Sequence, residues 1–347
     1  MTLSVDIRRQ LGNFHLDVRL EAGAEPLALL GASGCGKSVT LQCIAGILRP
    51  DEGHIELDGQ TLFDSASGVN LPPQRRNVGY LFQQYALFPN MTVRQNIAVA
   101  IRDRQARRRT AEELLLRFRL ADAADKRPRQ LSGGQQQRTA LARILASQPK
   151  AILLDEPFSA LDSYLKYQLE LELQDMLRGF PGPVIWVSHD RGEVWRNCPR
   201  VCVIARGRSE PVVPMEQLFR DPGTEPAARL SGCKNYVSVL PDGETVRIPD
   251  WNIRLHCGRT VPEDVKTAGI RSHHVEIAAG AGENCFACSV DRVIDDVFGA
   301  IVLLRPDGAV PGAPLLRMEL SKEAWAAQGG PARLSVRIAP EHLLLLR

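Results

Sequence analysis

The sequence lacks a long apolar run. Among its 347 residues, no stretch approaches the roughly 18 uninterrupted apolar residues of a membrane-spanning helix. The leucines at 343–346 form only a short C-terminal run. Residues 1–6 contain no apolar segment of the secretory kind, so a cleaved signal is not expected. Together these absences predict a soluble protein.

Cysteine is also sparse. Eight cysteines in the whole chain exclude a fold held by a disulfide framework. Cys285 and Cys288 form a CxxC pair, but no second pair follows at the spacing of a zinc site. A strand that places Phe286, Cys288 and Val290 on one face explains the pair without a metal. We therefore expect reduced thiols in a cytosolic protein.

The chain has no excess of charge of one sign. Its 43 Lys and Arg residues against 40 Asp and Glu residues give a net charge of +3 at pH 7. This balance argues against a nucleic-acid partner, although Arg102 to Arg109 is a local basic stretch. With 44% hydrophobic and 24% charged residues the composition is that of a globular protein, long enough for two domains.

Buried strands and helices alternate over much of the chain. Residues 27–30, 151–155 and 184–187 are short apolar runs typical of strands covered on both faces, and a helical pattern follows the first. This alternation predicts an α/β fold with a mainly parallel sheet and helices on both faces. The first 80 residues are β-rich, and residues 90–148 are expected to form a helical subdomain.

A second domain is expected after residue 226. Residues 211–226 are rich in proline, glycine and charge, which predicts domains at 1–226 and 227–347. Beyond this point short alternating runs between Asp-Gly turns predict a small all-β barrel. Residues 270–277 weakly echo residues 338–345, and we favour a duplicated strand-turn element over coincidence.

Residues 31–38 match the phosphate-binding P-loop pattern. Glycines let successive backbone N–H groups face phosphate oxygens, and the following helix N-terminus favours negative charge. Lys37 would reach the β- and γ-phosphates, and Ser38 would ligate Mg²⁺. The nucleotide contacts expected here are Gly31, Ser33, Gly34, Cys35, Gly36, Lys37, Ser38 and Val39.

Polar residues follow two of the predicted parallel strands. Asp155 could hold the hydration shell of Mg²⁺, and Glu156 could polarise an attacking water as a general base. His189 could hydrogen-bond the γ-phosphate, although a histidine here would more often be structural. Because ligands bind at the carboxyl ends of such strands, these residues and Gly31 are expected at one edge of the sheet.

The string Leu-Ser-Gly-Gly-Gln at residues 131–135 makes the sequence resemble the ATP-binding-cassette (ABC) transporter ATPases. The P-loop, this signature, the Asp155–Glu156 pair and His189 occur in that family's order. Gln83 matches its Q-loop position, and residues 159–162 match its D-loop. The resemblance covers roughly residues 1–235.

The resemblance implies Mg²⁺-dependent ATP hydrolysis at sites shared by two copies of the chain. Each ATP would lie between the P-loop of one copy and the signature of the other, so the chain must form a homodimer. The implied catalytic residues are Glu156, His189, Gln83 and Lys37, and the metal contacts are Ser38, Gln83 and Asp155. The implied further nucleotide contacts are Ser132, Gly133, Gly134, Gln135 and Asp162. The adenine contact stays open between Phe14, His15 and neither.

Within the family, residues 11–13, 79–89 and 230–235 resemble molybdate/sulfate-type importer ATPases, which carry a C-terminal β domain of the TOBE kind. This implies uptake of an oxyanion, molybdate first, through a membrane permease and indirectly a periplasmic solute-binding protein. The ATPase would lie peripherally at the cytoplasmic face of the inner membrane. Molybdate modules have Ser-x-Arg-Asn where this chain has residues 282–285, and Glu283 would repel an oxyanion. The C-terminal domain would then be regulatory or a dimer contact.

Three alternatives remain. An importer of sulfate, iron, sugar or polyamine has the same ATPase motifs, because the solute meets other subunits. An ABC ATPase acting on DNA or ribosomes normally has long coiled-coil insertions or tandem cassettes, which are missing here. A pure oxyanion-storage protein would not need the ATPase motifs. Residues 84–89, with Leu87 and Phe88, are expected to contact the permease, the alternative being that they cover the helical subdomain.

Overall fold

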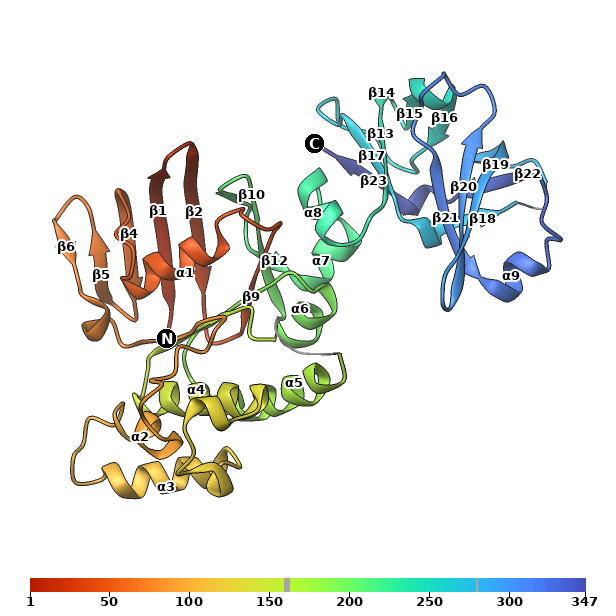
Figure 1. Cartoon of the computed structure of the whole chain (residues 1–347). Helices are drawn as coiled ribbons and strands as arrows, with labels where there is room; N and C mark the ends of the chain where they lie inside the picture. Colours follow the sequence, from red (N-terminus) through yellow and green to blue (C-terminus); the bar gives the residue numbers. More distant parts are fainter. Residues whose placement is uncertain (159–162, 279) are drawn as a thin grey trace. The chain divides into compact units, whose positions relative to one another are not determined.

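The computed structural model describes residues 1–158, 163–278 and 280–347 and divides into two units, Met1–Met215 and Glu216–Arg347 (Figure 1). The division lies inside the Pro- and Gly-rich segment 211–226, whereas the sequence analysis places the boundary at the end of that segment, at residue 226. Arg271 explains the difference, because its guanidinium donates hydrogen bonds to the carbonyl oxygens of Phe219 and Ser231. This segment is therefore attached to the second unit. In the described ranges, no helix combines the length and apolar character needed to span a membrane.

The first unit is built on one large sheet with strand order β6-β5-β4-β1-β2-β11-β10-β3-β9-β8-β7, β12 pairing with β10. The antiparallel strands at one end are β1 (Leu3–Leu11), β2 (Phe14–Ala22), β4 (Glu52–Leu57), β5 (Gln60–Asp64) and β6 (Val69–Asn70). The parallel strands are β3 (Leu27–Leu30), β7 (Val78–Leu81), β8 (Ala151–Asp155), β9 (Val184–Ser188) and β10 (Arg200–Ala205). Two short strands, β11 (Arg208–Ser209) and β12 (Val213–Pro214), pair with β10.

The strands follow the sequence pattern that predicts them. Every residue of β3, β8 and β9 is buried, as expected for parallel strands covered on both faces. Asp58 and Gly59 both have positive φ, which gives β4 and β5 the two-residue turn that suits a hairpin. The predicted parallel sheet is thus confirmed, with the carboxyl ends of β3, β8 and β9 along one edge.

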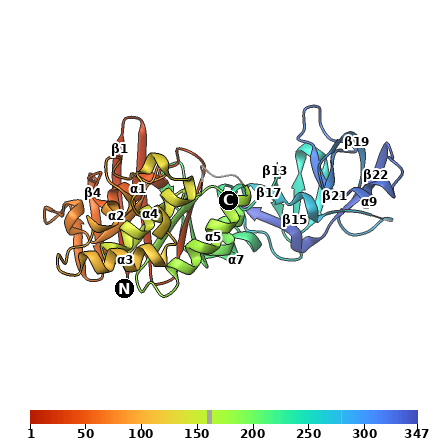
Figure 2. The ribbon, with the colours of Figure 1, turned by 60° about the horizontal axis from the view of Figure 1, so that its bottom comes forward.

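The helices of the first unit are α1 (Lys37–Ala45), α2 (Val93–Ala98), α3 (Arg107–Arg117), α4 (Gly133–Ala146), α5 (Ser163–Leu177) and α6 (Arg191–Asn197). The helices α2, α3 and α4 pack on one another in the region where a helical subdomain is expected (Figures 1 and 2). Thr92 and Ser132 start α2 and α4 with capping boxes.

The second unit is mainly β, as predicted. Its three sheets have the orders β18-β22-β19-β20-β21, β13-β17-β23 and β14-β15-β16. The strands are β13 (Asn235–Ser238), β14 (Leu240–Asp242), β15 (Thr245–Ile248), β16 (Ile253–His256), β17 (Thr267–Ile270), β18 (Val275–Ile277), β19 (Cys285–Asp295), β20 (Gly299–Pro306), β21 (Leu316–Ser321), β22 (Arg333–Ile338) and β23 (Leu343–Leu346). The short helices are α7 (Met215–Arg220), which begins at the last residue of the first unit, α8 (Glu225–Leu230) and α9 (Lys322–Ala326).

The weak internal echo corresponds to two similar structural elements. Each consists of a strand, a 3₁₀ turn and a second strand, namely β17 with β18 and β22 with β23. The two elements pair with each other, because β17 is antiparallel to β23 and β18 is antiparallel to β22. His274 of one turn stacks on His342 of the other, with ring centroids 3.8 Å apart. This arrangement agrees with the predicted duplicated element.

Candidate active site

The P-loop connects the buried strand β3 to the start of α1. Gly34 and Gly36 have φ values of 76° and 113°, which side chains of L residues rarely adopt. A Cβ at Gly36 would lie 2.5 Å from Cδ1 of Leu16, and one at Gly31 would lie 2.4 Å from the carbonyl oxygen of Ile204. Since α1 has no side-chain cap at its N-terminus, its first N–H groups remain suited to an anion.

Lys37 makes contacts within this loop, and Ser38 connects the loop to β8. The buried Nζ of Lys37 donates hydrogen bonds to the carbonyl oxygens of Gly31 at 2.7 Å and Ala32 at 3.0 Å. The positive charge is therefore held inside the loop, where phosphate oxygens would be received. Ser38 Oγ donates to Asp155 Oδ1 at 2.9 Å, which joins the P-loop to the end of β8.

Asp155 is a buried carboxylate held by two hydroxyl groups. Besides Ser38, the hydroxyl of Tyr80 on β7 donates to its Oδ2 at 2.8 Å. Burial raises the pKa of Asp155, and the two hydrogen bonds act against that rise. Burial also raises the pKa of Tyr80, so its phenol stays a donor. Tyr80 was not among the predicted site residues. The feature that could have indicated it is its position on β7, the strand that pairs with β8.

The residues around Asp155 fit a magnesium ion. In the residues that the structure describes, no group of three or more His, Cys, Asp or Glu could hold a metal by itself. Mg²⁺ is usually held by one or two protein oxygens together with substrate phosphates and water, rather than by a cage of side chains. The Ser38 hydroxyl and the Asp155 carboxylate supply oxygens of that kind.

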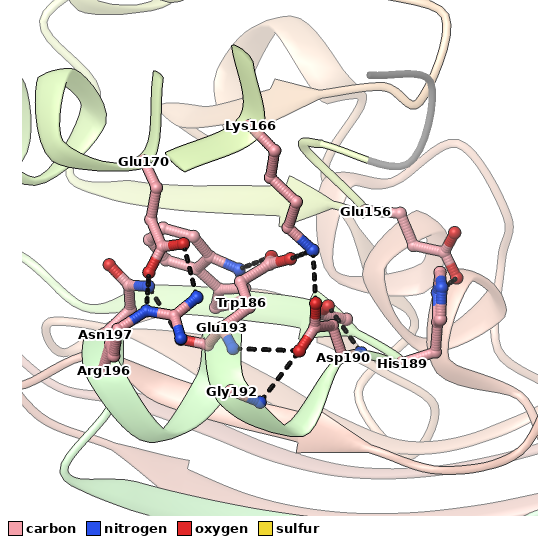
Figure 3. A network of polar contacts seen from close by, with 11 residues as sticks. Glu156, Lys166, Glu170, Trp186, His189, Asp190, Gly192, Glu193, Arg196 and Asn197 are labelled. Carbon is pink, nitrogen blue, oxygen red and sulfur yellow. Dashed lines mark hydrogen bonds and ion pairs between the residues drawn. The ribbon is translucent and has the colours of Figure 1, made fainter. Parts of the chain in front are cut away.

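Glu156 and His189 meet at the ends of neighbouring parallel strands. Oε1 of Glu156 lies 3.4 Å from Nδ1 of His189 (Figure 3). Glu156 has a φ of 47°, and its backbone N–H donates to the carbonyl oxygen of Val187 at 3.0 Å. A left-handed conformation outside glycine costs about 1 kcal/mol or more and frequently occurs at functional sites. The predicted grouping of Gly31, Asp155, Glu156 and His189 at one sheet edge is what the structure has.

The signature forms the start of α4. Ser132 Oγ accepts a hydrogen bond from the N–H of Gln135 at 3.3 Å, and Gln135 Oε1 accepts one from the N–H of Ser132 at 3.1 Å. Gly133 and Gly134 form the first turn, and Gly134 is buried, with Cδ1 of Leu169 3.3 Å from the position that a Cβ would take. The signature thus begins a helix separate from α1. The side chains of Ser132 and Gln135 each bond the backbone N–H of the other residue.

Other predicted site residues lie around this centre. Gln83 is exposed in the turn after β7, and Phe14 begins β2 beside Gly36 and packs partly on the core. His15 contacts Gln10 Oε1 through Nδ1 at 3.1 Å. Asp162, with the rest of residues 159–162, lies outside the described residues, and an adenine contact for Phe14 or His15 stays a prediction.

The loop after Gln83 is fixed by the helical region. Tyr85 and Ala86 both have positive φ, at 58° and 44°. Arg143 of α4 donates hydrogen bonds to their carbonyl oxygens at 3.2 and 2.9 Å, and its guanidinium lies 5.1 Å from the ring centre of Phe88. Asn96 of α2 also holds the loop, since its Oδ1 accepts from the N–H of Phe88 at 2.9 Å. Neither Arg143 nor Asn96 was predicted.

Arg143→Met is expected to lower the free energy of unfolding by about 2 kcal/mol, because two carbonyl oxygens lose a charged donor. Urea denaturation of the full chain measures the loss. Arg109→Met is the control, since Arg109 makes only an exposed ion pair with Glu113 and should change stability by less than about 0.5 kcal/mol. Equal losses in the two variants would contradict the role of Arg143.

Comparisons with known proteins agree with the fold. The family model described as ABC transporter matches residues 14–159. The molybdenum import ATP-binding protein ModC of Paramagnetospirillum magneticum is 40% identical over 226 residues, which cover 65% of this chain and 62% of that protein. The corresponding ModC of Rhodospirillum rubrum is 36% identical over 352 residues, which cover 97% of this chain and 93% of that protein.

A polyamine importer is also similar. The spermidine/putrescine import ATP-binding protein PotA of Thermobifida fusca is 39% identical over 248 residues, covering 70% of this chain and 62% of that protein. The chain thus matches about three fifths of the length of two of these relatives and nearly all of the third.

Among solved structures, the dimeric post-hydrolysis state of the ATP-binding cassette MJ0796, bound to ADP and Pi, is 29% identical with a TM-score of 0.52. The match covers 62% of this chain and 99% of that cassette. We conclude from the ABC ATPase fold of the first unit, the order of its motifs and the extent of these matches that this chain belongs to the family of ABC transporter ATP-binding proteins.

Proposed function

We propose that the chain hydrolyses ATP as the energy-supplying subunit of an ABC importer. The observation that carries this proposal is the cluster of Lys37, Ser38, Asp155, Glu156 and His189 at one edge of the parallel sheet. Lys37 would contact the β- and γ-phosphates, and Ser38 and Asp155 would hold Mg²⁺, which neutralises phosphate charge when bound.

Glu156 would accept a proton from the attacking water, and His189 would hold the γ-phosphate and orient Glu156. Gln83 would contact the same phosphate and ion from the turn after β7. The chain supplies one P-loop and one signature, so a homodimer would complete two sites. The position of Gly133 and Gly134 in the first turn of α4 supports this role, because helix starts bind phosphate.

For the transported solute we propose an oxyanion, with molybdate first. The support is one match that runs through both units: the R. rubrum molybdenum relative aligns with 97% of the chain, whereas the P. magneticum molybdenum relative aligns with 65% and the polyamine relative with 70%. Sulfate or a polyamine is the alternative. A membrane permease and a periplasmic solute-binding protein would complete the importer, with this chain at the cytoplasmic face of the inner membrane.

We further propose that the C-terminal unit regulates or dimerises rather than binding the oxyanion at residues 282–285. Oε1 of Glu283 lies 2.8 Å from Nδ1 of His256, which places a carboxylate at this segment. The Asn284 side chain exchanges hydrogen bonds with the backbone of His256, at 2.7 and 2.8 Å. This segment thus fastens β16 and offers an oxyanion no positive side chain of its own.

The proposal is tested by reconstituting the chain in liposomes with a permease and a solute-binding protein of the molybdate-importer type. ATP-dependent uptake of labelled molybdate is expected, with sulfate and spermidine as comparison solutes. ATP hydrolysis with uptake of spermidine alone would refute the solute but keep the ATPase. No hydrolysis by the complete complex would refute the function.

Phe88→Ala is expected to weaken co-purification with the permease while ATP affinity stays within about twofold. Phe88 is 46% exposed although Arg143 and Asn96 fix its loop, and exposed apolar groups on a rigid loop favour a contact surface. Leu116→Ala is the control, because Leu116 is 69% exposed on α3 of the same helical region. Normal permease binding with reduced stability would mean that Phe88 only packs on the helices.

A further inference from the structure

Ion pairs at two places join α5 to α6 and its cap beside Glu156 and His189 (Figure 3). Lys166 of α5 contacts Asp190 Oδ2 at 2.6 Å and Glu193 Oε2 at 3.0 Å. One turn further along α5, Glu170 binds Arg196 through two hydrogen bonds of 2.8 Å. The Lys166 contacts adjoin His189, whereas the Glu170–Arg196 pair lies toward the far end of α6.

The turn that carries His189 is fixed through Asp190. Asp190 Oδ1 caps α6 by accepting hydrogen bonds from the N–H groups of Gly192 at 2.8 Å and Glu193 at 3.2 Å. Its own N–H donates to Ser188 Oγ at 3.1 Å, so the backbone is held on both sides of His189. The His189 side chain itself is 62% exposed, and its position depends on this turn.

Among the described residues, Lys166 is the cation that contacts the second carboxylate oxygen of the cap, Asp190 Oδ2. Its ammonium also faces Glu193, a buried carboxylate whose Oε1 accepts a hydrogen bond from Trp186 Nε1 at 2.7 Å. Burial by itself would lower the pKa of Lys166. Its hydrogen bonds to Asp190 and Glu193 outweigh this effect and raise the pKa, so Lys166 stays charged. Burial would raise the pKa of Asp190, but Lys166 and the helix N–H groups lower it.

We propose that Lys166 is a positioning residue for His189: by fixing Asp190 against α5, it holds the imidazole beside Glu156 for ATP hydrolysis. This inference rests on the proposed ATPase activity. A displacement of about 1 Å at a positioned group can reduce a rate by up to about a hundredfold. The effect is expected in kcat, because Lys166 does not touch the P-loop that binds ATP.

The experiment compares the full-length wild type with Lys166→Met and Lys166→Arg. Lys166→Met is expected to reduce kcat for ATP about tenfold and leave KM within about twofold. Lys166→Arg keeps the charge and should restore kcat to within about threefold of wild type. If Lys166→Met fails to fold, Asp190→Asn replaces it, because asparagine still caps α6 but loses the charge that binds Lys166.

Arg196→Met is the matched control. It breaks the other ion pair between the same helices, so it should lower the melting temperature comparably while kcat stays within about twofold. An equal loss of kcat in Arg196→Met would overturn the proposal, since general packing of α5 on α6 would explain both. Adding Lys166→Met to His189→Ala should cause no further loss of kcat, because the imidazole that Lys166 positions is already gone. If the double variant loses the same additional factor in kcat as Lys166→Met alone, the proposal is overturned.

A readout without turnover separates this inference from the proposed function. The imidazole resonances of His189, followed by NMR, are expected to shift or broaden in Lys166→Met and to stay unchanged in Arg196→Met. If the wild type hydrolyses no ATP, the ATPase proposal is refuted, and with it the catalytic role of Lys166. If the wild type is active but the His189 resonances of Lys166→Met match those of the wild type, only the role of Lys166 is refuted.

Discussion

Glu156→Gln is expected to reduce ATP hydrolysis by two to four orders of magnitude while ATP still binds. The amide keeps the shape of the side chain but cannot accept the proton of the attacking water, and general bases contribute factors of about 10² to 10⁴. The left-handed backbone at Glu156 is retained, because only the terminal group changes. Phosphate release under saturating ATP measures the loss, and a titration with Mg-ATP measures the binding.

The variant should also accumulate as an ATP-bound dimer, which size-exclusion chromatography would detect. Asp175→Asn is the control, since Asp175 is exposed on α5 and pairs only with Arg178 three residues away. A Glu156→Gln protein that hydrolyses ATP at nearly the wild-type rate would mean that another group activates the water.

Lys37→Ala is expected to weaken ATP binding about a hundredfold. The substitution removes the one side-chain ammonium that the P-loop holds, and losing one partner of a buried charged contact typically costs about 2–5 kcal/mol of binding free energy. Isothermal titration of the full chain with Mg-ATP measures the change.

The control for this variant is Lys150→Ala, because Lys150 makes an exposed ion pair with Asp58 in the same unit. Its ATP affinity should equal that of the wild type. If Lys37→Ala binds ATP normally and keeps its melting temperature, the loop does not bind the phosphates in the expected way.

Local patterns in the sequence were enough to predict the sheet and the centre of the site. The all-apolar strands β3, β8 and β9 predict burial on both faces, and parallel strands must bring their carboxyl ends to one edge. Gly31, Asp155 and His189 therefore meet, although many residues separate them in the chain. The glycine pattern and the capping box likewise depend on neighbouring residues alone.

The residues that escaped prediction act over long sequence distances. Tyr80 reaches Asp155 across 75 residues, and Arg143 reaches the backbone of Tyr85 across 58. Such contacts depend on packing and on side-chain-to-backbone geometry, which leave no periodicity in the sequence. The division after Met215 lies within the segment 211–226 that the sequence indicates, and its exact place depends on Arg271, which holds the later part of that segment by hydrogen bonds to Phe219 and Ser231.

The indole of Trp186 gives the molecule an internal optical probe. It is buried on β9, lies 6.0 Å from the ring of Phe158 and donates to the carboxylate of Glu193. Such dry surroundings favour blue-shifted emission, and a nearby carboxylate modulates its intensity. The half-exposed Trp195 on α6 would emit at longer wavelength. Once Trp251, which is equally buried in the second unit, and the other tryptophans are replaced by phenylalanine, the fluorescence of Trp186 can follow the region behind Glu156 and His189 without any attached dye.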